Sequence, residues 1–127
     1  MENNEIEYAK LITDVDRCTR CPFVDKSLLL IGPNNGPLNA DLLFIGAAPG
    51  KKIPGASLKP FSVGPSSNNF NLFLSSADIN RDEVHITNAV LHIPLQNDKA
   101  RNPDITEIAN CNSFLKRQID IINPKIV

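Results

Sequence analysis

The sequence predicts an α/β fold with a mainly parallel sheet, because patterns typical of helices and strands alternate along its 127 residues. Asp41–Ile45 is a short apolar run stopped by Gly46, as expected for a strand that is buried on both faces of a sheet. Val84–Val90 reads as a second strand, and a segment with helical periodicity follows each of the two. This order favours a layered sheet of parallel strands joined by helices.

The first element is a helix, expected over Glu5–Arg17, where apolar side chains recur at helical spacing. These side chains are Ile6, Ala9, Leu11, Ile12 and Val15. The helix should end before the turn that holds Cys18 and Cys21. A loop rich in Gly, Pro and Asn, Gly32–Pro37, then leads to the first strand.

A long loop and a helix are expected between the two strands. Gly46–Pro65 contains four prolines and four glycines in twenty residues, a composition typical of loops. Ser66–Ser76 should be helical and should connect this loop to the second strand.

The last helix is expected at about Asp104–Ile122, after a polar loop. Its apolar side is expected to consist of Ile105, Ile108, Cys111, Leu115, Ile119 and Ile122. Asn123 and Pro124 should end the helix. Lys125–Val127 looks like the first residues of a third strand.

Composition limits the classes of protein without selecting one. With 42% hydrophobic residues and no apolar run near the roughly 18 residues of a membrane span, the chain reads as one soluble domain or part of one. Its 13 basic and 14 acidic residues give a net charge of −1, so total charge does not indicate a nucleic-acid partner. Three cysteines argue against a disulfide framework, and the N-terminus lacks an apolar signal core. We therefore expect a reducing, cytoplasmic location.

The cysteines are candidate metal ligands. A two-residue spacer lets the thiolates of Cys18 and Cys21 bind one metal centre, and Cys111 lies far downstream. Iron–sulfur and zinc sites need a fourth ligand, for which His92 is the candidate. The alternative is that these cysteines are free and pack as small hydrophobic residues. The spacing alone leaves both interpretations open.

Six motifs occur in an order that resembles the uracil-DNA glycosylase superfamily, in its iron–sulfur branch. They are CTRCP, FIGAAPG, KPF, ITNAV, EIANC and INPKIV, and they span about residues 10 to 127. The resemblance implies a single three-layer α/β/α domain over residues 1–127, with a 4Fe-4S cluster, or zinc as the alternative. It implies base excision repair of uracil-containing DNA by a monomeric hydrolase. Such an enzyme acts on a flipped-out or single-stranded base and breaks its N-glycosidic bond.

The loops after the two strands hold the residues suited to this reaction, because ligands of parallel sheets bind where strands end. Gly46 and Ala47 open a turn whose backbone N–H groups can approach a base or an attacking water. The turn continues through Ala48, Pro49 and Gly50, and the substrate would touch it there. An ordinary turn between a strand and a loop is the alternative.

Two side chains complete the expected uracil site. Phe61 lies in a polar, Pro-rich loop and would stack on the base, although most phenylalanines are simply core residues. Asn88 would read uracil, since a carboxamide offers an acceptor to N3–H and a donor to a carbonyl oxygen. The alternative for Asn88 is a hydrogen bond with neighbouring backbone.

His92 stands where the iron–sulfur branch usually has a cysteine, after Leu91 in place of a lysine. The X-type members resemble this chain more closely, because they have a histidine at that point. A neutral imidazole can replace a thiolate on iron. A structural histidine is the alternative.

Several departures from the family pattern concern catalysis. Ala47 replaces the glutamate of the family-4 motif, and Ile53 and Pro65 stand where branches of the family have further acidic residues. No histidine lies between His92 and Cys111, so the covalent trap of the X-type branch is not supported. The family's later catalytic segment, a histidine followed by Pro-Ser, lies beyond PKIV.

The chain therefore reads as a partial family member whose sheet is incomplete at the C-terminus. We expect excision of uracil to be slow or absent. The competing functions are a catalytically weak or inactive iron–sulfur protein that binds nucleic acid, and a remnant without a ligand.

Overall fold

The computed structural model of the chain describes residues 2–26, 30–49 and 65–127. Its three helices are α1 (Glu2–Asp16), α2 (Pro65–Ser76) and α3 (Ile105–Ile122). Its strands are β1 (Val24–Asp25), β2 (Leu43–Gly46), β3 (His85–Asn88), β4 (Ile93–Gln96) and β5 (Lys99–Ala100), and two 3-10 helices are η1 (Pro33–Asn35) and η2 (Arg81–Glu83). The three expected helices and the two expected strands are thus present. None of the described helices has the length and apolar content of a membrane span.

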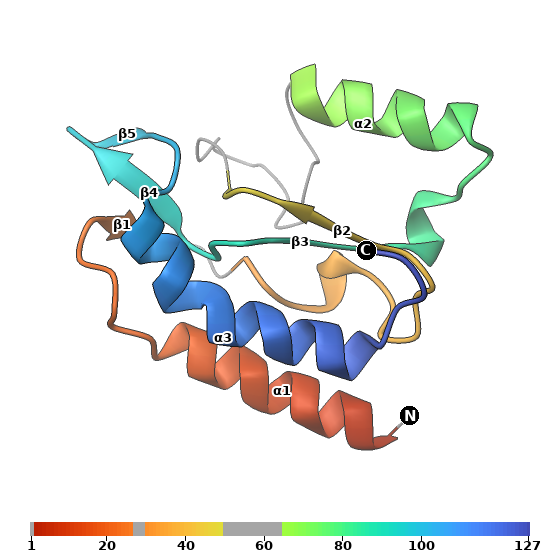
Figure 1. The fold of residues 1–127 in the computed structure, drawn as a ribbon, viewed down its shortest axis with the longest axis horizontal. Helices are drawn as coiled ribbons and strands as arrows, with labels where there is room; N and C mark the ends of the chain where they lie inside the picture. Colours follow the sequence, from red (N-terminus) through yellow and green to blue (C-terminus); the bar gives the residue numbers. More distant parts are fainter. Residues whose placement is uncertain (1, 27–29, 50–64) are drawn as a thin grey trace.

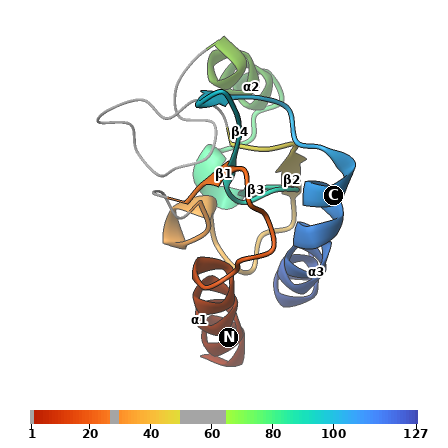
Figure 2. The same cartoon turned by 90° about the vertical axis from the view of Figure 1, so that its left-hand side faces the viewer.

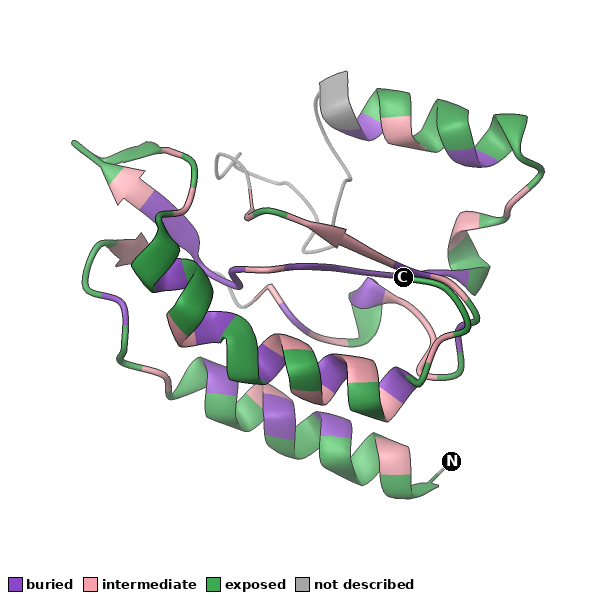
Figure 3. Cartoon of the chain, in the orientation of Figure 1, coloured by how far each residue is buried: buried purple, intermediate pink, exposed green. Residues whose placement is uncertain are grey.

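Helices cover both faces of the pair β2 and β3 (Figure 1). Helices α1 and α3 lie side by side on one face and α2 lies on the other, an arrangement that the rotated view of Figure 2 also shows. Alternation along the strands explains this. Leu43 of β2 belongs to an apolar cluster with Ile122 of α3, whereas Ile86 of β3 clusters with Leu74 of α2. As Figure 3 shows, β3 is buried along its whole length.

The strands are only partly parallel, so the prediction of a mainly parallel sheet is corrected. Strands β2 and β3 are parallel, and Ile126 forms a parallel bridge with Leu42, where the sequence predicts the start of a third strand. The strands β1, β4 and β5 form a separate antiparallel sheet, with β4 in the middle. The fold is therefore mixed α/β.

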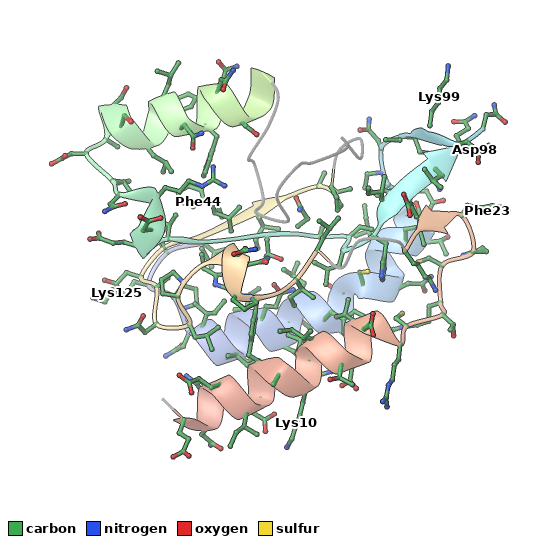
Figure 4. The ribbon with its side chains drawn as sticks, turned by 180° about the vertical axis from the view of Figure 1, so that it is seen from behind. Lys10, Phe23, Phe44, Asp98, Lys99 and Lys125 are labelled. Atoms are coloured by element: carbon green, nitrogen blue, oxygen red, sulfur yellow. The ribbon has the colours of Figure 1, made fainter. Side chains whose placement is uncertain are left out.

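The antiparallel sheet replaces part of what the sequence analysis takes as a polar loop. Asn97 and Asp98 join β4 to β5 and have φ angles of 51° and 62°. Asn and Asp tolerate this left-handed conformation, and two such residues form the tight turn typical of hairpins. Figure 4 shows Asp98 and Lys99 at the tip of this hairpin, pointing away from the rest of the protein.

A capping box starts α3. The Asp104 carboxylate accepts a hydrogen bond from Glu107 N (2.8 Å), and the Glu107 carboxylate accepts one from Asp104 N (3.0 Å). Glu107 also forms a bidentate ion pair with Arg101, at 2.6 and 2.9 Å. Arg101 Nε donates to Leu95 O (2.9 Å), so this pair ties the hairpin to α3.

The buried face of α3 agrees only in part with the predicted one. Cys111 and Ile122 are buried as predicted, whereas Ile105 is 86% exposed and Ile108 is 42% exposed. The other buried side chains are Glu107, Phe114 and Gln118. The ion pair with Arg101 compensates the free-energy cost of burying the Glu107 carboxylate. The side of α3 that faces the core is therefore rotated relative to the apolar side that the sequence predicts.

The loop around η1 covers the free edge of β3. Asn35 Nδ2 donates to Ile86 O (3.0 Å), and Asn35 Oδ1 accepts from Gly32 N (3.1 Å). Tyr8 of α1 donates its hydroxyl hydrogen to Gly32 O (2.9 Å). A covered edge cannot pair with another chain.

Candidate functional site

Strands β2 and β3 end side by side. Gly46 is the register partner of Asn88. Ala89 N donates to Gly46 O (2.8 Å), and Val90 N donates to Ala47 O (3.1 Å). The two loops in which the sequence analysis places the uracil site therefore begin at one point of the sheet, as parallel pairing requires.

Asn88 is buried, with 7% of its surface exposed. Its carboxamide makes no hydrogen bond with any residue that the structure describes. Alternation along β3 places Asn88 on the same face as Ile86, the face that α2 covers. The alternative use of Asn88, bonding to neighbouring backbone, is thus not found in the described part of the chain.

The turn after β2 offers backbone groups and little side-chain chemistry. Ala47 is exposed, and Ala48 and Pro49 are half-buried. The Ala48 methyl packs against the core cluster that contains Val90 and Leu91. A methyl group at position 47 can neither transfer a proton nor stabilise positive charge. Gly50 and Phe61, also expected in the site, lie outside the described residues.

Pairing of β1 with β4 brings His92 toward the cysteine turn. Cys18 and Cys21 follow α1, and β1 begins three residues after Cys21. Asp25 of β1 is the register partner of Ile93, which is the neighbour of His92. Strand β4, which begins directly after His92, therefore runs beside the segment that follows the two cysteines.

Two of the three thiol groups have shifted pKa values. Burial raises the pKa of Cys111, and the nearby Cys21 and Cys18 raise it further, against a hydrogen bond from the Leu91 backbone. For Cys18, burial is outweighed by hydrogen bonds from Arg20 and by the charges of Arg20 and Lys26, which lower its pKa. Cys18 packs against the apolar cluster that contains Cys111, and Cys21 Sγ lies 3.5 Å from Asn110 Nδ2, so the turn after α1 faces the second turn of α3.

His92 is 6% exposed, and its ring makes no hydrogen bond with a described residue. Burial and the charge of Lys26 lower its pKa, against the attraction of Asp16 and Asp25. The imidazole is therefore neutral at pH 7, the form that can bind a metal. However, no group of three or more His, Cys, Asp or Glu side chains in the described part is arranged to hold a single metal ion.

Three cavities on the described part of the surface lie away from both groups of candidate residues. A cavity of about 370 Å³ lies between η1 and η2, and one of about 540 Å³ adjoins it. A third, of about 490 Å³, is lined by Phe23 and the base of the hairpin. The residues lining these three cavities include neither Asn88 nor the cysteines.

The sequence analysis missed one residue beside the cysteines. Asn110 Nδ2 lies 3.0 Å from Arg20 O and 3.5 Å from Cys21 Sγ. Its position next to Cys111 on a helix is the only signal that the sequence offers for this contact.

Comparison with known proteins connects these residues to one family. The profile of the Uracil DNA glycosylase superfamily matches residues 33–127. The chain is 33% identical over 123 residues to the Type-4 uracil-DNA glycosylase of Thermotoga maritima, covering 95% of this chain and 60% of that protein. It is 35% identical over 121 residues to the protein of the same name from Saccharolobus solfataricus, covering 92% and 52%. For the Sulfurisphaera tokodaii protein of that name, identity is 32% over 118 residues, covering 93% and 51%. The chain thus spans 51% to 60% of the length of these relatives.

Proposed function

The chain belongs to the uracil DNA glycosylase superfamily, and on that premise we propose that it is a DNA repair protein acting on uracil. It binds a uracil that is flipped out of DNA or lies in a single strand, and it hydrolyses the N-glycosidic bond of that base. A single-stranded substrate is favoured because little stacking has to be broken to expose the base.

Asn88 carries this proposal. It is buried at the end of β3, opposite Gly46, and its carboxamide has no hydrogen-bonding partner among the described residues. In the complex, Oδ1 accepts the N3–H of uracil and Nδ2 donates to a uracil carbonyl oxygen. Cytosine presents an acceptor at N3 and an amino group beside it, so it would leave the same carboxamide mismatched.

The turn after β2 acts beside Asn88. The backbone N–H groups of Gly46, Ala47, Ala48 and Gly50 hold the attacking water and the base, Pro49 packs beside them, and Phe61 stacks on the base. The hydrogen bonds from Ala89 N to Gly46 O and from Val90 N to Ala47 O support the placement of this turn next to the base-reading strand. The motif positions of Gly50 and Phe61 support their roles.

Hydrolysis should be slow in this chain. Removing one well-placed acid, base or electrostatic group commonly lowers a rate by about 10²- to 10⁴-fold. Ala47 presents a methyl group where the family-4 motif has a carboxylate. In the turn after β2, water positioned by backbone groups is then the catalytic device that remains.

We further propose a 4Fe-4S cluster held by Cys18, Cys21, His92 and Cys111. Each ligand of such a cluster binds a different iron, so the ligands stand further apart than those of a single ion. Cys18 packs against the apolar cluster that contains Cys111, and Cys21 Sγ lies 3.5 Å from Asn110 Nδ2, which supports a common centre for the three thiol groups. When bound, the cluster would be redox-active. It would also link the turn after α1, the start of β4 and α3, which carry its ligands.

We also propose an architecture for the domain. Helices on both faces of β2 and β3, together with the Ile126 bridge, support a three-layer α/β/α domain whose parallel part includes a third strand beside β2. We propose that the domain acts as a monomer in the cytoplasm.

A second candidate function is binding of uracil-containing nucleic acid with little or no catalysis. The exposed Ala47 methyl favours it, because loss of a carboxylate at this position is expected to remove chemistry without changing the strand that carries Asn88.

Two assays on the purified full chain separate these functions. A single-stranded oligonucleotide with one uracil and a matched one with thymine are compared for affinity and for release of free base. Tighter binding of the uracil strand with slow uracil release supports the glycosylase. Tighter binding without release supports the binding protein. Equal affinity for the two strands without release overturns both.

A further inference from the structure

Asn110 joins α3 to the turn that carries the first two cysteines. Its Nδ2 atom lies 3.0 Å from Arg20 O and 3.5 Å from Cys21 Sγ. A carboxamide nitrogen carries two hydrogen atoms, so it can donate one to each of these acceptors. The side chain therefore fixes the turn and directs an N–H group at the sulfur atom of Cys21.

The orientation of this carboxamide follows from its two neighbours. A rotated amide would place Oδ1 against the carbonyl oxygen of Arg20 and against Sγ of Cys21, which are both acceptors. Cys21 is 7% exposed, so water competes little with the N–H group. A hydrogen bond to sulfur is stronger in such surroundings than in water.

The other two cysteines have different neighbours. The Leu91 backbone lies near Cys111, and Arg20 lies near Cys18. In the described part of the chain, Asn110 is the side chain that donates a hydrogen bond to Cys21 Sγ. A substitution can remove this donor while leaving the four candidate ligands unchanged.

We propose that Asn110 is a positioning residue that raises the reduction potential of the cluster through its hydrogen bond to Cys21. The inference rests on the cluster of the proposed function. Reduction adds a negative charge that the ligand sulfur atoms share, and an N–H group pointing at sulfur stabilises that charge. Asn110 thus favours the reduced state, in addition to holding the turn through Arg20 O.

The test measures the midpoint potential of protein purified without oxygen, together with iron and sulfide per chain. Asn110→Ala removes the donor, and Asn110→Asp keeps the shape of the side chain while replacing donors by a carboxylate. Asn112→Ala is the matched control, because Asn112 lies on the same helix with its side chain exposed. We expect Asn110→Ala to shift the reduction equilibrium about three- to tenfold toward the oxidised cluster, where tenfold is about 59 mV for one electron. Asn110→Asp should shift it further in the same direction, and the control should not shift it.

The direction of the change separates this role from a structural one. A loosened turn lets water reach the cluster, and water stabilises the more negative reduced state, so the potential would rise. An unchanged or raised potential in both Asn110 variants, with wild-type iron and sulfide content, overturns the inference and leaves the cluster itself in place. Wild-type protein without iron and sulfide overturns the proposed cluster, and the inference with it. If Asn110→Ala does not fold, the midpoint potential of Asn110→Asp decides between the two roles by the same criterion.

Discussion

Asn88 lies opposite Gly46, and Ala47 directly follows Gly46, so Ala47 stands where the paired strands β2 and β3 end. The pairing continues past the strands, because Val90 N donates to Ala47 O (3.1 Å). A side chain at position 47 is therefore close to the strand that presents Asn88. Position 47 is therefore the place at which we would introduce a carboxylate.

We expect Ala47→Glu to increase the rate of uracil release from single-stranded DNA by about 10²-fold or more, because it returns a carboxylate to the turn. Ala47→Gln is the matched control, since it has the same size without the charge. Release is measured in single-turnover reactions. Equal rates for the two variants would show that the charge at position 47 does not assist the reaction.

The fourth cluster ligand is tested with His92→Cys. A thiolate at this position should retain or increase the iron and sulfide bound per chain and the broad absorbance near 400 nm, because it restores the ligand usual in the iron–sulfur branch. His92→Ala should lower both. Wild-type protein that is colourless and contains one zinc per chain would identify a structural zinc clamp instead.

Gly36 tests the loop that covers the edge of β3. It has a φ of +130°, and a Cβ atom there would clash with the Val84 carbonyl oxygen and lie 2.8 Å from His85 Cα. We expect Gly36→Ala to lower the free energy of unfolding by about 2 kcal/mol or more. In urea denaturation, Gly32→Ala is the control, since nothing lies within 4 Å of its added Cβ and it should change stability little. Equal stability of the two variants would contradict the geometry of this loop.

The ion pair between Arg101 and Glu107 makes stability depend on pH. The hydrogen bond from Arg101 is the largest influence on Glu107 and lowers its pKa. A carboxyl group whose pKa is lowered by folding stabilises the protein above its ordinary pKa, about 4.3, and loses that effect as pH falls through the folded value. Glu107→Gln, which keeps the shape, should therefore reduce stability by about 1–2 kcal/mol at pH 7, and by less below pH 4.

The measurement compares apparent melting temperatures of wild type and Glu107→Gln from pH 7 to pH 3. A difference of a few degrees should be constant above about pH 5 and should shrink as the carboxyl group of the wild type is protonated. Glu7→Gln is the control, because Glu7 pairs with Lys10 at 3.3 Å on the exposed face of α1 and should contribute little. A difference for Glu107→Gln that does not change with pH would show that the pair is not electrostatic.

The sequence predicts the part of the fold whose signals are local. The apolar run before Gly46 and the pattern over Val84–Val90 predict two parallel strands, because a strand buried on both faces is rich in apolar residues. Parallel pairing then places Gly46 next to Asn88. The cysteine spacing likewise points to a common centre before any contact is known.

The antiparallel sheet and the rotation of α3 could not be predicted in this way. Strand β4 contains Pro94 and is short, so the Asn97-Asp98 turn is its main signal. The exposed Ile105 and the buried Glu107 reverse the expected pattern of α3, because Arg101 compensates the buried charge. The pairing of Glu107 with Arg101 is a tertiary contact, so the spacing of apolar residues along α3 does not reveal it.

The most direct test of the account is the affinity ratio between matched single-stranded oligonucleotides that carry uracil or cytosine, measured for wild type and Asn88→Asp. Asn112→Asp, with the same charge change on an exposed side chain, is the control. If Asn88 reads uracil, wild type and the control should prefer the uracil strand. In Asn88→Asp this preference should fall by about tenfold or more, because the donor to the uracil carbonyl is lost and a buried group is left unpaired. An unchanged ratio in Asn88→Asp would remove Asn88 from the site and contradict the account.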